Sequence, residues 1–263
     1  MKIVDLGDEH KQSFFWCLED WSDEIKEAGD HKARWYQKMK DRGLRVKLAL
    51  DDKGAPGGMI QYIPIEHSGA VGKDLYFIQC IWVHGYEKGR GNYQNKGMGT
   101  ALLKAAEEDA RNLGAKGMVA RGIWLLPFWM RAGWFKKHGY RKVDRDGLML
   151  LLWKKFAEDA VPPSFMKQKK GPEKKPGVVT VTALVNGWCP AMGMTIERAK
   201  RAAAEFGDKV NVVEHDTTDG GVMAEWGMTD ALFVDDKQMP TGPPPSYEKI
   251  RKLIEKRVNK LAR

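Results

Sequence analysis

The stretch that decides the fold of this 263-residue chain is Gln94-Asn95-Lys96-Gly97-Met98-Gly99-Thr100. It lies between a predicted strand that ends at Val83 and a predicted helix that begins at Thr100. Its two glycines let the backbone approach a ligand without a Cβ in the way, and the unpaired N–H groups at the start of a helix attract an anion. The stretch therefore predicts a binding site for a pyrophosphate group.

On both sides of this stretch, apolar periodicity predicts an α/β fold in which helices flank a mixed sheet. The expected elements are a strand at 2–6, helical stretches at 9–28 and 31–40, a hairpin of 44–50 and 58–65, a strand at 75–83, a helix at 100–113, a strand at 116–121, a helix at 127–138 and strands at 141–143 and 148–156.

A segment rich in Pro and Lys, residues 161–177, shows no apolar periodicity and predicts an extended linker. It separates a first domain at 1–160 from a second, smaller α/β domain at 178–263. The elements expected in the second domain are a strand at 178–185, a helix at 190–206, a strand at 210–214, a short helix at 221–226, a hairpin across 235–237 and a helix at 247–261.

The formal net charge of +9 is unevenly distributed along the chain. Residues 163–177 contribute +4 and residues 248–263 contribute +5, so the rest of the chain is neutral in sum. Lysines on a linker and along a terminal helix are typical of a solvated surface, so a nucleic-acid partner is disfavoured.

The sequence also indicates in which cellular compartment the protein is expected. Its longest apolar stretches are shorter than the roughly 18 to 20 residues that a bilayer requires, and residues 1–5 lack the apolar segment of a secretory signal. A cytoplasmic protein without a membrane partner is expected. Three cysteines without a C-x-x-C pair disfavour both a disulfide framework and a zinc site, and no metal site is expected.

The glycine stretch resembles motif A of the GNAT acetyltransferases, Q/R-x-x-G-x-G/A, which follows the fourth strand and opens the third helix of that fold. The order of elements from Lys2 to Phe156 is similar to a complete GNAT domain, and Trp134-Phe135-Lys136-Lys137-His138-Gly139-Tyr140 is similar to the family's F-Y-x-K-x-G-F ending of the fourth helix. The resemblance implies a CoA-dependent N-acyltransferase that moves an acetyl group directly from acetyl-CoA, as co-substrate, to a small amine.

The resemblance also implies where the acyl-CoA binds. Its pyrophosphate would lie on the N–H groups of residues 94–100, and its pantetheine would lie beside the strand that ends at Val83. The residues expected at this site are Trp82, Val83, Gln94, Asn95, Lys96, Gly97, Met98, Gly99 and Thr100.

The sequence departs from the family pattern in its groups for proton transfer. Phe135 stands where many members carry a tyrosine that reprotonates the CoA thiolate, and the strand 76–81 offers no carboxylate as a base. Direct transfer to an amine that arrives deprotonated needs mainly positioning. Otherwise a base would reach in from a loop, and Glu66, His67 and His84 are the local candidates. The loop 84–93 is longer than in the family, which predicts a remodelled mouth of the site.

Cys189 is the third candidate catalytic residue, beside His84 and Glu66. It stands at the N-cap of a predicted helix with Pro190 at the first helical position, an arrangement that lowers the pKa of a thiol. The Trp188-Cys189 pair resembles a thioredoxin-type active site, and a GNAT domain followed by a thioredoxin-like domain is similar to YoaP-like acetyltransferases. Met192 occupies the place of the second cysteine, which excludes an intramolecular dithiol cycle.

Three roles for Cys189 stay open at this point: a nucleophilic thiol, a packed turn residue and a metal ligand. A thiol-containing acceptor is one expectation. The alternative function is a thiol-redox or sensor protein that uses Cys189, with a GNAT domain that binds CoA without transfer. The acceptor and the oligomeric state, a dimer included, are left open by the sequence.

Overall fold

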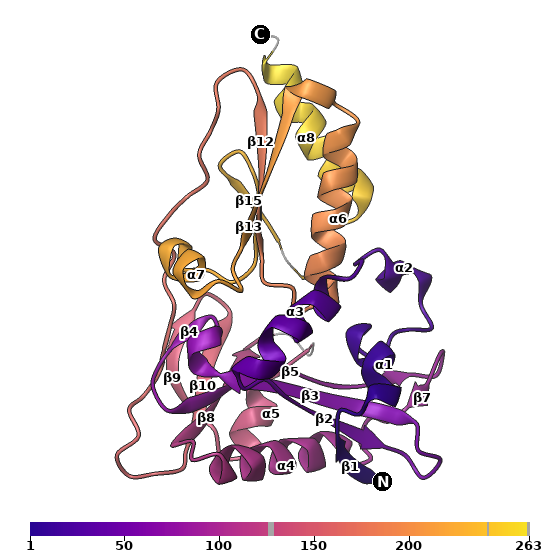
Figure 1. Ribbon diagram of the computed structural model, residues 1–263, viewed down its shortest axis with the longest axis vertical. Coiled ribbons are helices and arrows are strands. Elements are labelled where there is room, and N and C mark those ends of the chain that lie inside the picture. The colour runs from indigo at the N-terminus through magenta and orange to yellow at the C-terminus, as the bar shows by residue number, and fades with distance from the viewer. Residues whose placement is uncertain (126–128, 241, 262–263) are drawn as a thin grey trace. The chain divides into compact units, whose positions relative to one another are not determined.

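The computed structural model describes residues 1–125, 129–240 and 242–261 and divides into two compact units (Figure 1). The first unit comprises residues 1–21 and 37–166, and the second comprises residues 22–36 and 167–263. This division differs from the predicted domain boundaries in two places. Residues 22–36 group with the second unit, and the predicted linker at 161–177 is divided after Met166.

The first unit is built on a seven-stranded sheet with the order β1-β2-β3-β5-β8-β10-β9. Only β5 and β8 are parallel, and all other neighbours are antiparallel. This is the mixed sheet that the sequence predicts. The strands are β1 (Lys2–Asp5), β2 (Arg45–Leu50), β3 (Pro56–Pro64), β5 (Leu75–Val83), β8 (Gly117–Ile123), β9 (Arg141–Asp146) and β10 (Met149–Lys155).

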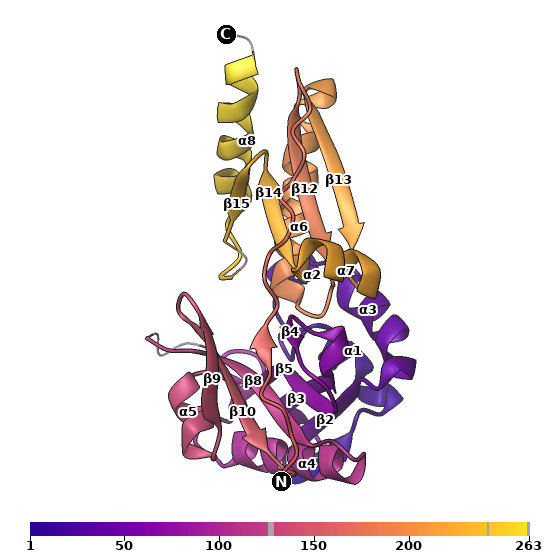
Figure 2. The ribbon, with the colours of Figure 1, turned by 90° about the vertical axis from the view of Figure 1, so that its left-hand side faces the viewer.

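Two helices, α4 (Met98–Asn112) and α5 (Ala132–Lys137), pack on one face of this sheet (Figure 2). The sequence predicts an apolar stripe on α4 formed by Leu102, Leu103, Ala106, Ala110 and Leu113. The first four are buried in the main core, whereas Leu113, the C-cap, is 51% exposed. The helix begins at Met98, two residues earlier than predicted, because Gly97 is its N-cap. Residues 127–128 of the predicted helix at 127–138 lie outside the described part of the chain.

The sheet opens where β5 and β8 separate. The two strands pair only over Leu75–Ile78 and Gly117–Ala120. Just beyond, the register of β5 against β3 shifts, because Tyr62 lies opposite Ile78 whereas Gln61 lies opposite Cys80. Gln79 is therefore the extra residue of a β-bulge, which bends a strand and increases its twist. The ends of β5 and β8 diverge from this point.

The predicted helical stretch 9–28 is wrong as a continuous helix. It contains the 3₁₀ turn η1 (Asp8–His10), α1 (Lys11–Phe15) and α2 (Asp23–Lys26). Cys17 and Leu18 interrupt it with positive φ angles of 51° and 65°, a conformation that no α-helix contains. The next stretch forms α3 (His31–Met39) and the 3₁₀ turn η2 (Lys40–Arg42), close to the prediction.

Several short pairings were not predicted. The long loop 84–93 forms a hairpin of β6 (Gly85–Tyr86) and β7 (Gly91–Asn92). After the 3₁₀ turn η3 (Ile65–His67), β4 (Ala70–Val71) pairs with β11 (Ser164–Phe165). The predicted linker is therefore fastened to the first unit at its start.

The second unit has a four-stranded sheet with the order β13-β12-β14-β15. Strands β12 and β13 are parallel, and the other pairs are antiparallel. The elements are β12 (Val179–Val185), α6 (Pro190–Ala204), η4 (Gly207–Lys209), β13 (Val210–Asp216), α7 (Gly220–Trp226), β14 (Ala231–Val234), β15 (Lys237–Met239) and α8 (Tyr247–Leu261). Helices α6 and α8 contact each other over the core of this unit.

An ion cluster fastens residues 22–36 within the second unit. Arg198 on α6 is only 5% exposed and bonds Glu24 and Glu27. The ring of His31 lies 2.8 Å from Glu197, also on α6. None of the described helices combines the length and the hydropathy that a bilayer crossing requires.

Candidate active site

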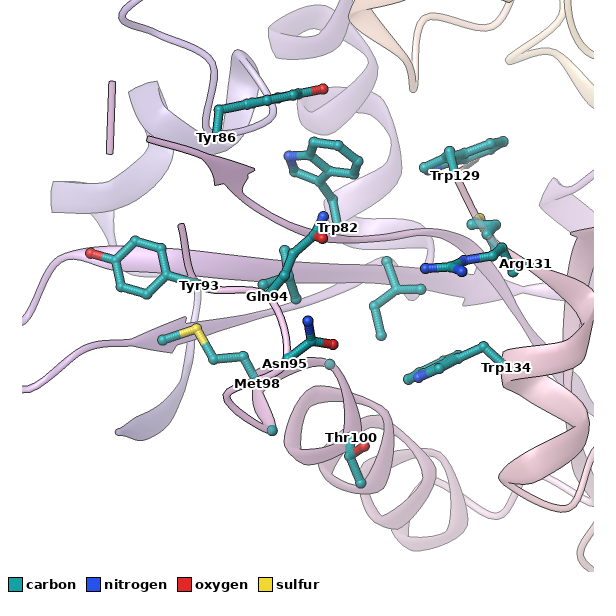
Figure 3. A pocket seen from close by; sticks show the side chains of 15 residues that line it. Trp82, Tyr86, Tyr93, Gln94, Asn95, Met98, Thr100, Trp129, Arg131 and Trp134 are labelled. Carbon is teal, nitrogen blue, oxygen red and sulfur yellow. The ribbon is translucent and has the colours of Figure 1, made fainter. Parts of the chain in front are cut away.

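A cavity of about 610 Å³ lies in the first unit, where the ends of β5 and β8 diverge (Figure 3). The residues that line it are Ile81, Trp82, Val83, Tyr86, Tyr93, Gln94, Asn95, Gly97, Met98, Gly99, Thr100, Trp129, Met130, Arg131 and Trp134. Its wall thus combines an aromatic surface with the N-terminus of α4.

The start of α4 is built to bind an anion. Gly97 takes the left-handed conformation, with φ of 81°, which glycine adopts without strain. No side chain caps this helix, so the N–H groups of its first turn are left for a ligand. These groups and the positive end of the helix dipole favour a phosphate.

Eight of the nine residues predicted for the acyl-CoA site line this cavity. They are Trp82, Val83, Gln94, Asn95, Gly97, Met98, Gly99 and Thr100. The ninth, Lys96, is not on the wall, and its Nζ lies 5.4 Å from the ring centroid of Tyr93. The position of the eight agrees with the prediction, and acyl-CoA binding by them stays a prediction.

The sequence did not predict one wall of the cavity. Trp129, Met130, Arg131 and Trp134 come from the segment that precedes and opens α5. For Trp134 a signal is present, because Ala132 and Phe135 form the buried face of α5 and the two residues between them, Gly133 and Trp134, point away from that face. Nothing in the local pattern marks Trp129 or Arg131.

Phe135 does not face the cavity. Its side chain is 0% exposed and packs in the core against Tyr140, with the ring centroids 5.4 Å apart. A tyrosine at position 135 would place its hydroxyl in the same core. The proton donor that this position supplies in the family pattern therefore has no counterpart here.

The hairpin β6–β7 supplies Tyr86 and Tyr93 to the opposite wall. The hydroxyl of Tyr93 donates to Asp51, and this hydrogen bond raises the pKa of the phenol. Arg90, at the turn of the hairpin, bonds both carboxylate oxygens of Asp20. These bonds hold the predicted long loop as a fixed wall of the mouth.

His84 is not placed to act as a base, which corrects the prediction. Its side chain is fully buried and is not part of the cavity wall. Nε2 accepts a hydrogen bond from the indole of Trp21 at 3.0 Å, so the proton lies on Nδ1, which donates to the carbonyl of Gly91 at 2.8 Å. The ring thus joins the end of β5 to the hairpin.

Glu66 is also misplaced for catalysis. It is exposed on η3, which follows the end of β3 at Pro64, and Pro64 lies opposite Tyr76. Tyr76 precedes Val83 by seven residues, which corresponds to roughly 20 Å along the strand. His67 lies on the same turn, and burial together with nearby Arg42 lowers its pKa. Both residues lie at the opposite end of the sheet from the cavity.

Glu19 is the acidic side chain that the sequence reasoning missed. Burial raises the pKa of this carboxyl, and His84, Trp82, Trp21 and Arg90 partly offset the effect. Its Oε2 lies 3.8 Å from Nε2 of His84. Trp82, which interacts with this carboxyl, lines the cavity, whereas Glu19 is not among the described lining residues. Glu19 falls within the predicted helix at 9–28, where the sequence gives no sign that its side chain is buried.

Cys189 belongs to the second unit, where it caps α6. Its backbone is extended, Pro190 follows at the first helical position, and its carbonyl accepts from the amides of Met192 and Gly193. The indole of the neighbouring Trp188 donates to Asp230 at 2.7 Å. The predicted N-cap is therefore present, and the role of its thiol stays a prediction. Across the three described ranges, no cluster of His, Cys, Asp and Glu is arranged to hold a metal ion.

Comparison with known proteins gives a family match for the N-terminal part of the chain. The model of the acetyltransferase (GNAT) family matches residues 5–125. This match supports an acetyl-CoA-dependent acyltransferase activity for that part of the chain, with an acyl-CoA as co-substrate. A search of curated proteins found no match to the chain.

Several solved structures are similar to part of the chain. A GNAT-family acetyltransferase from Staphylococcus aureus is 15% identical, with 59% of this chain and 99% of that chain covered and a TM-score of 0.44. A GNAT N-acetyltransferase from Escherichia coli, in complex with CoA, is 12% identical, with 62% and 88% covered and a TM-score of 0.44. An N-acetyltransferase from Thermoplasma acidophilum, in complex with CoA, is 16% identical, with 59% and 100% covered and a TM-score of 0.43.

Proposed function

We propose that the acetyltransferase domain transfers an acetyl group directly from acetyl-CoA to a small amine. The observation that carries this proposal is the uncapped N-terminus of α4, which opens with Gly97 into the cavity between β5 and β8. The pyrophosphate would lie on the first N–H groups of α4, and the thioester would extend along Ile81–Val83 to the place where the strands diverge.

The chemistry that this arrangement supports is a single displacement. The nitrogen lone pair of the amine attacks the thioester carbonyl, the C–N bond forms, the C–S bond breaks, and the CoA thiolate leaves and takes up a proton. No residue on the described wall carries a carboxylate or an imidazole. The amine would therefore lose its proton to solvent, and catalysis would rest on positioning, a contribution that reaches about 7 to 11 kcal/mol in well-oriented reactions.

Two measurements test the proposal. Isothermal titration of the full chain with acetyl-CoA is expected to give a one-to-one complex with a micromolar dissociation constant. A thiol-detection assay is expected to show CoA release that depends on an added amine and yields the N-acetylated product in equal amount. Failure to bind acetyl-CoA contradicts the proposal, and CoA release without an acetylated amine would reduce it to a hydrolase.

For the second unit, the observation that favours a thioredoxin-like module is the order of its elements. A βαβ start and a ββα finish surround a sheet in which β12 lies between parallel β13 and antiparallel β14, and Cys189 follows β12 at the N-cap of α6. A thiol at such a position can form a mixed disulfide with a thiol-containing substrate.

Alkylation tests this second proposal. Iodoacetamide at pH 7 is expected to label Cys189 faster than Cys80, which is buried in β5. Peptide mass spectrometry of the full chain and of Cys189→Ser distinguishes the sites. Equal and slow labelling of the two thiols would contradict a reactive Cys189 and leave the acyltransferase proposal untouched.

A further inference from the structure

Among the described residues that line the cavity, Arg131 carries the single formal charge, on its guanidinium. Among the fifteen lining residues there is no Asp, Glu, Lys or His. Figure 3 shows the Arg131 side chain pointing into the cavity from the wall that also carries Trp129 and Trp134. No described carboxylate forms an ion pair with Arg131. Its charge is therefore left for a ligand.

The backbone holds Arg131 at the point where the sheet opens. Arg131 is the N-cap of α5, and it forms a parallel bridge with Ile123 at the end of β8. The amide of Ile123 donates to the carbonyl of Met130 at 2.9 Å. The guanidinium is thus presented from the end of β8, opposite the end of β5, where the reacting group of the thioester is proposed to lie.

The aromatic residues beside it favour an anion site. Arg131 is exposed to solvent on the cavity side, and Trp82, Trp129 and Trp134 surround it with apolar ring surface. A charge-assisted hydrogen bond beside such a surface is stronger than one among solvated polar groups. An arginine binds a carboxylate through two parallel hydrogen bonds, whereas a cationic ligand would meet repulsion from this wall.

We propose that Arg131 makes this cavity select a reactant that bears a carboxylate. The carboxylate belongs either to the acceptor, which would then be an amino acid or a similar amine, or to the acyl chain of a dicarboxylic acyl-CoA. This inference rests on the proposed acyl transfer and names the substrate class of that same site. The pyrophosphate is assigned to the N-terminus of α4, so Arg131 is not needed to bind it.

Matched substrates test the inference on the full chain. For the acceptor, kcat/KM is compared between amino acids and their amides, for example leucine and leucinamide, over a panel of side chains. For the acyl group, acetyl-CoA is compared with succinyl-CoA. The carboxylate form of one pair is expected to be favoured about tenfold to a hundredfold, and Arg131→Gln is expected to abolish that preference. Arg131→Lys is expected to restore part of the preference, because lysine keeps the charge but cannot donate two parallel hydrogen bonds to one carboxylate.

A matched control separates recognition from a general effect of charge. Arg145→Gln removes the same charge from a position on β9 that is exposed like Arg131 but is not part of the cavity wall, and it is expected to leave the preference unchanged. Equal kcat/KM for both members of every pair, in wild type, overturns the inference. A rise in the KM for acetyl-CoA in Arg131→Gln, with the same loss for all acceptors, also overturns it, because Arg131 would then bind the CoA phosphates.

A binding measurement keeps this inference separate from the transfer reaction. Quenching of tryptophan fluorescence by N-acetyl-leucine and by N-acetyl-leucinamide, in the presence of CoA, reports a ligand beside Trp82, Trp129 and Trp134. Tighter binding of the carboxylate in wild type, but not in Arg131→Gln, supports the inference. Equal binding of both products, together with equal dissociation constants of acetyl-CoA and succinyl-CoA, contradicts the inference, whereas CoA binding measured in the same cuvette stays unaffected.

Discussion

The indole N–H of Trp21 donates a hydrogen bond to Nε2 of His84 at 3.0 Å, although the two residues are 63 positions apart in the chain. This bond joins the turn before α2 to the end of β5. Because His84 is fully buried, Nε2 has no water to replace the indole. The hydrogen bond is therefore a structural support of the cavity mouth.

Trp21→Phe removes this donor and is expected to destabilise the first unit. An unsatisfied buried acceptor costs about 1 to 3 kcal/mol, and urea unfolding followed by far-UV circular dichroism measures the loss. Trp124→Phe makes the same change at an indole that is 51% exposed and is expected to cost under about 0.5 kcal/mol. Equal losses in the two variants would mean that the bond contributes nothing.

A second prediction concerns Asp109 on α4, which receives two hydrogen bonds of 2.9 Å from Arg45 and another from the hydroxyl of Tyr62. Burial raises the pKa of this carboxyl, but the bonds from Arg45 and Tyr62 outweigh it and lower the pKa below the usual value. Asp109→Asn is expected to cost roughly 2 kcal/mol at pH 7, less than the 3 to 5 kcal/mol of a fully buried pair because Arg45 is partly exposed.

The pH dependence of that loss has a definite sign. A carboxyl whose pKa is lower in the folded state stabilises the protein above its unfolded pKa of about 3.9, and this contribution is lost as the pH falls through the folded pKa. The difference in unfolding free energy between wild type and Asp109→Asn should be largest near pH 6 to 7 and should shrink below about pH 4. A difference that grows with acid would contradict the assigned network.

A third prediction uses two glycines at opposite ends of α4. Gly97 and Gly114 have φ of 81° and 83°, and a Cβ at either would meet no atom within 4 Å. Alanine at either position should therefore cost about 1 to 2 kcal/mol of backbone strain and nothing from packing. Gly97→Ala is also expected to weaken acetyl-CoA binding by about fivefold to tenfold in a titration, because it disturbs the anion site. Gly114→Ala should lose only stability, and weakened binding in both variants would point to a global effect.

The sequence predicted those parts of the fold that rest on local pattern. The stripe on α4, the strand β5 and the glycines at 97 and 99 carry periodic or steric signals that need no tertiary context. The strand end and most of the glycine loop line the cavity, where the sequence predicts the acyl-CoA, and its binding there stays a prediction.

The rest of the site depends on contacts between distant segments. His84 is withdrawn from the cavity by Trp21, and Arg131 is brought to it by the pairing of β8, which no short pattern encodes. The pair β4 with β11 is only two residues long and lacks an alternation that could mark it. The break at Cys17 and Leu18 needs positive φ angles that neither residue type favours, so the stretch was expected to be a helix.

A fourth prediction concerns the attachment of residues 22–36 within the second unit. Arg198 holds Glu24 and Glu27, and its hydrogen bonds lower the pKa of Glu27. Arg198→Met is expected to speed amide hydrogen exchange over residues 22–36 and to cost about 2 to 4 kcal/mol, because it removes a nearly buried partner of two carboxylates. Arg201→Met alters the same helix and the same Glu27, but Arg201 is exposed and should cost under about 1 kcal/mol. Similar rates of amide hydrogen exchange over residues 22–36 in both variants would contradict the prediction that Arg198 contributes most to this attachment.

The last prediction decides whether Phe135 limits the rate. If the phenylalanine at this position merely lacked a useful hydroxyl, Phe135→Tyr would raise kcat. The side chain is fully buried against Tyr140, so the added oxygen is instead expected to lose about 1 to 3 kcal/mol of stability through overpacking and a missing hydrogen bond, with kcat changed less than about twofold. Trp134→Tyr is the informative contrast, because residue 134 lines the cavity and its change should alter the KM for acetyl-CoA. A clear rise of kcat in Phe135→Tyr, measured together with an unchanged melting temperature, would place position 135 at the thioester after all.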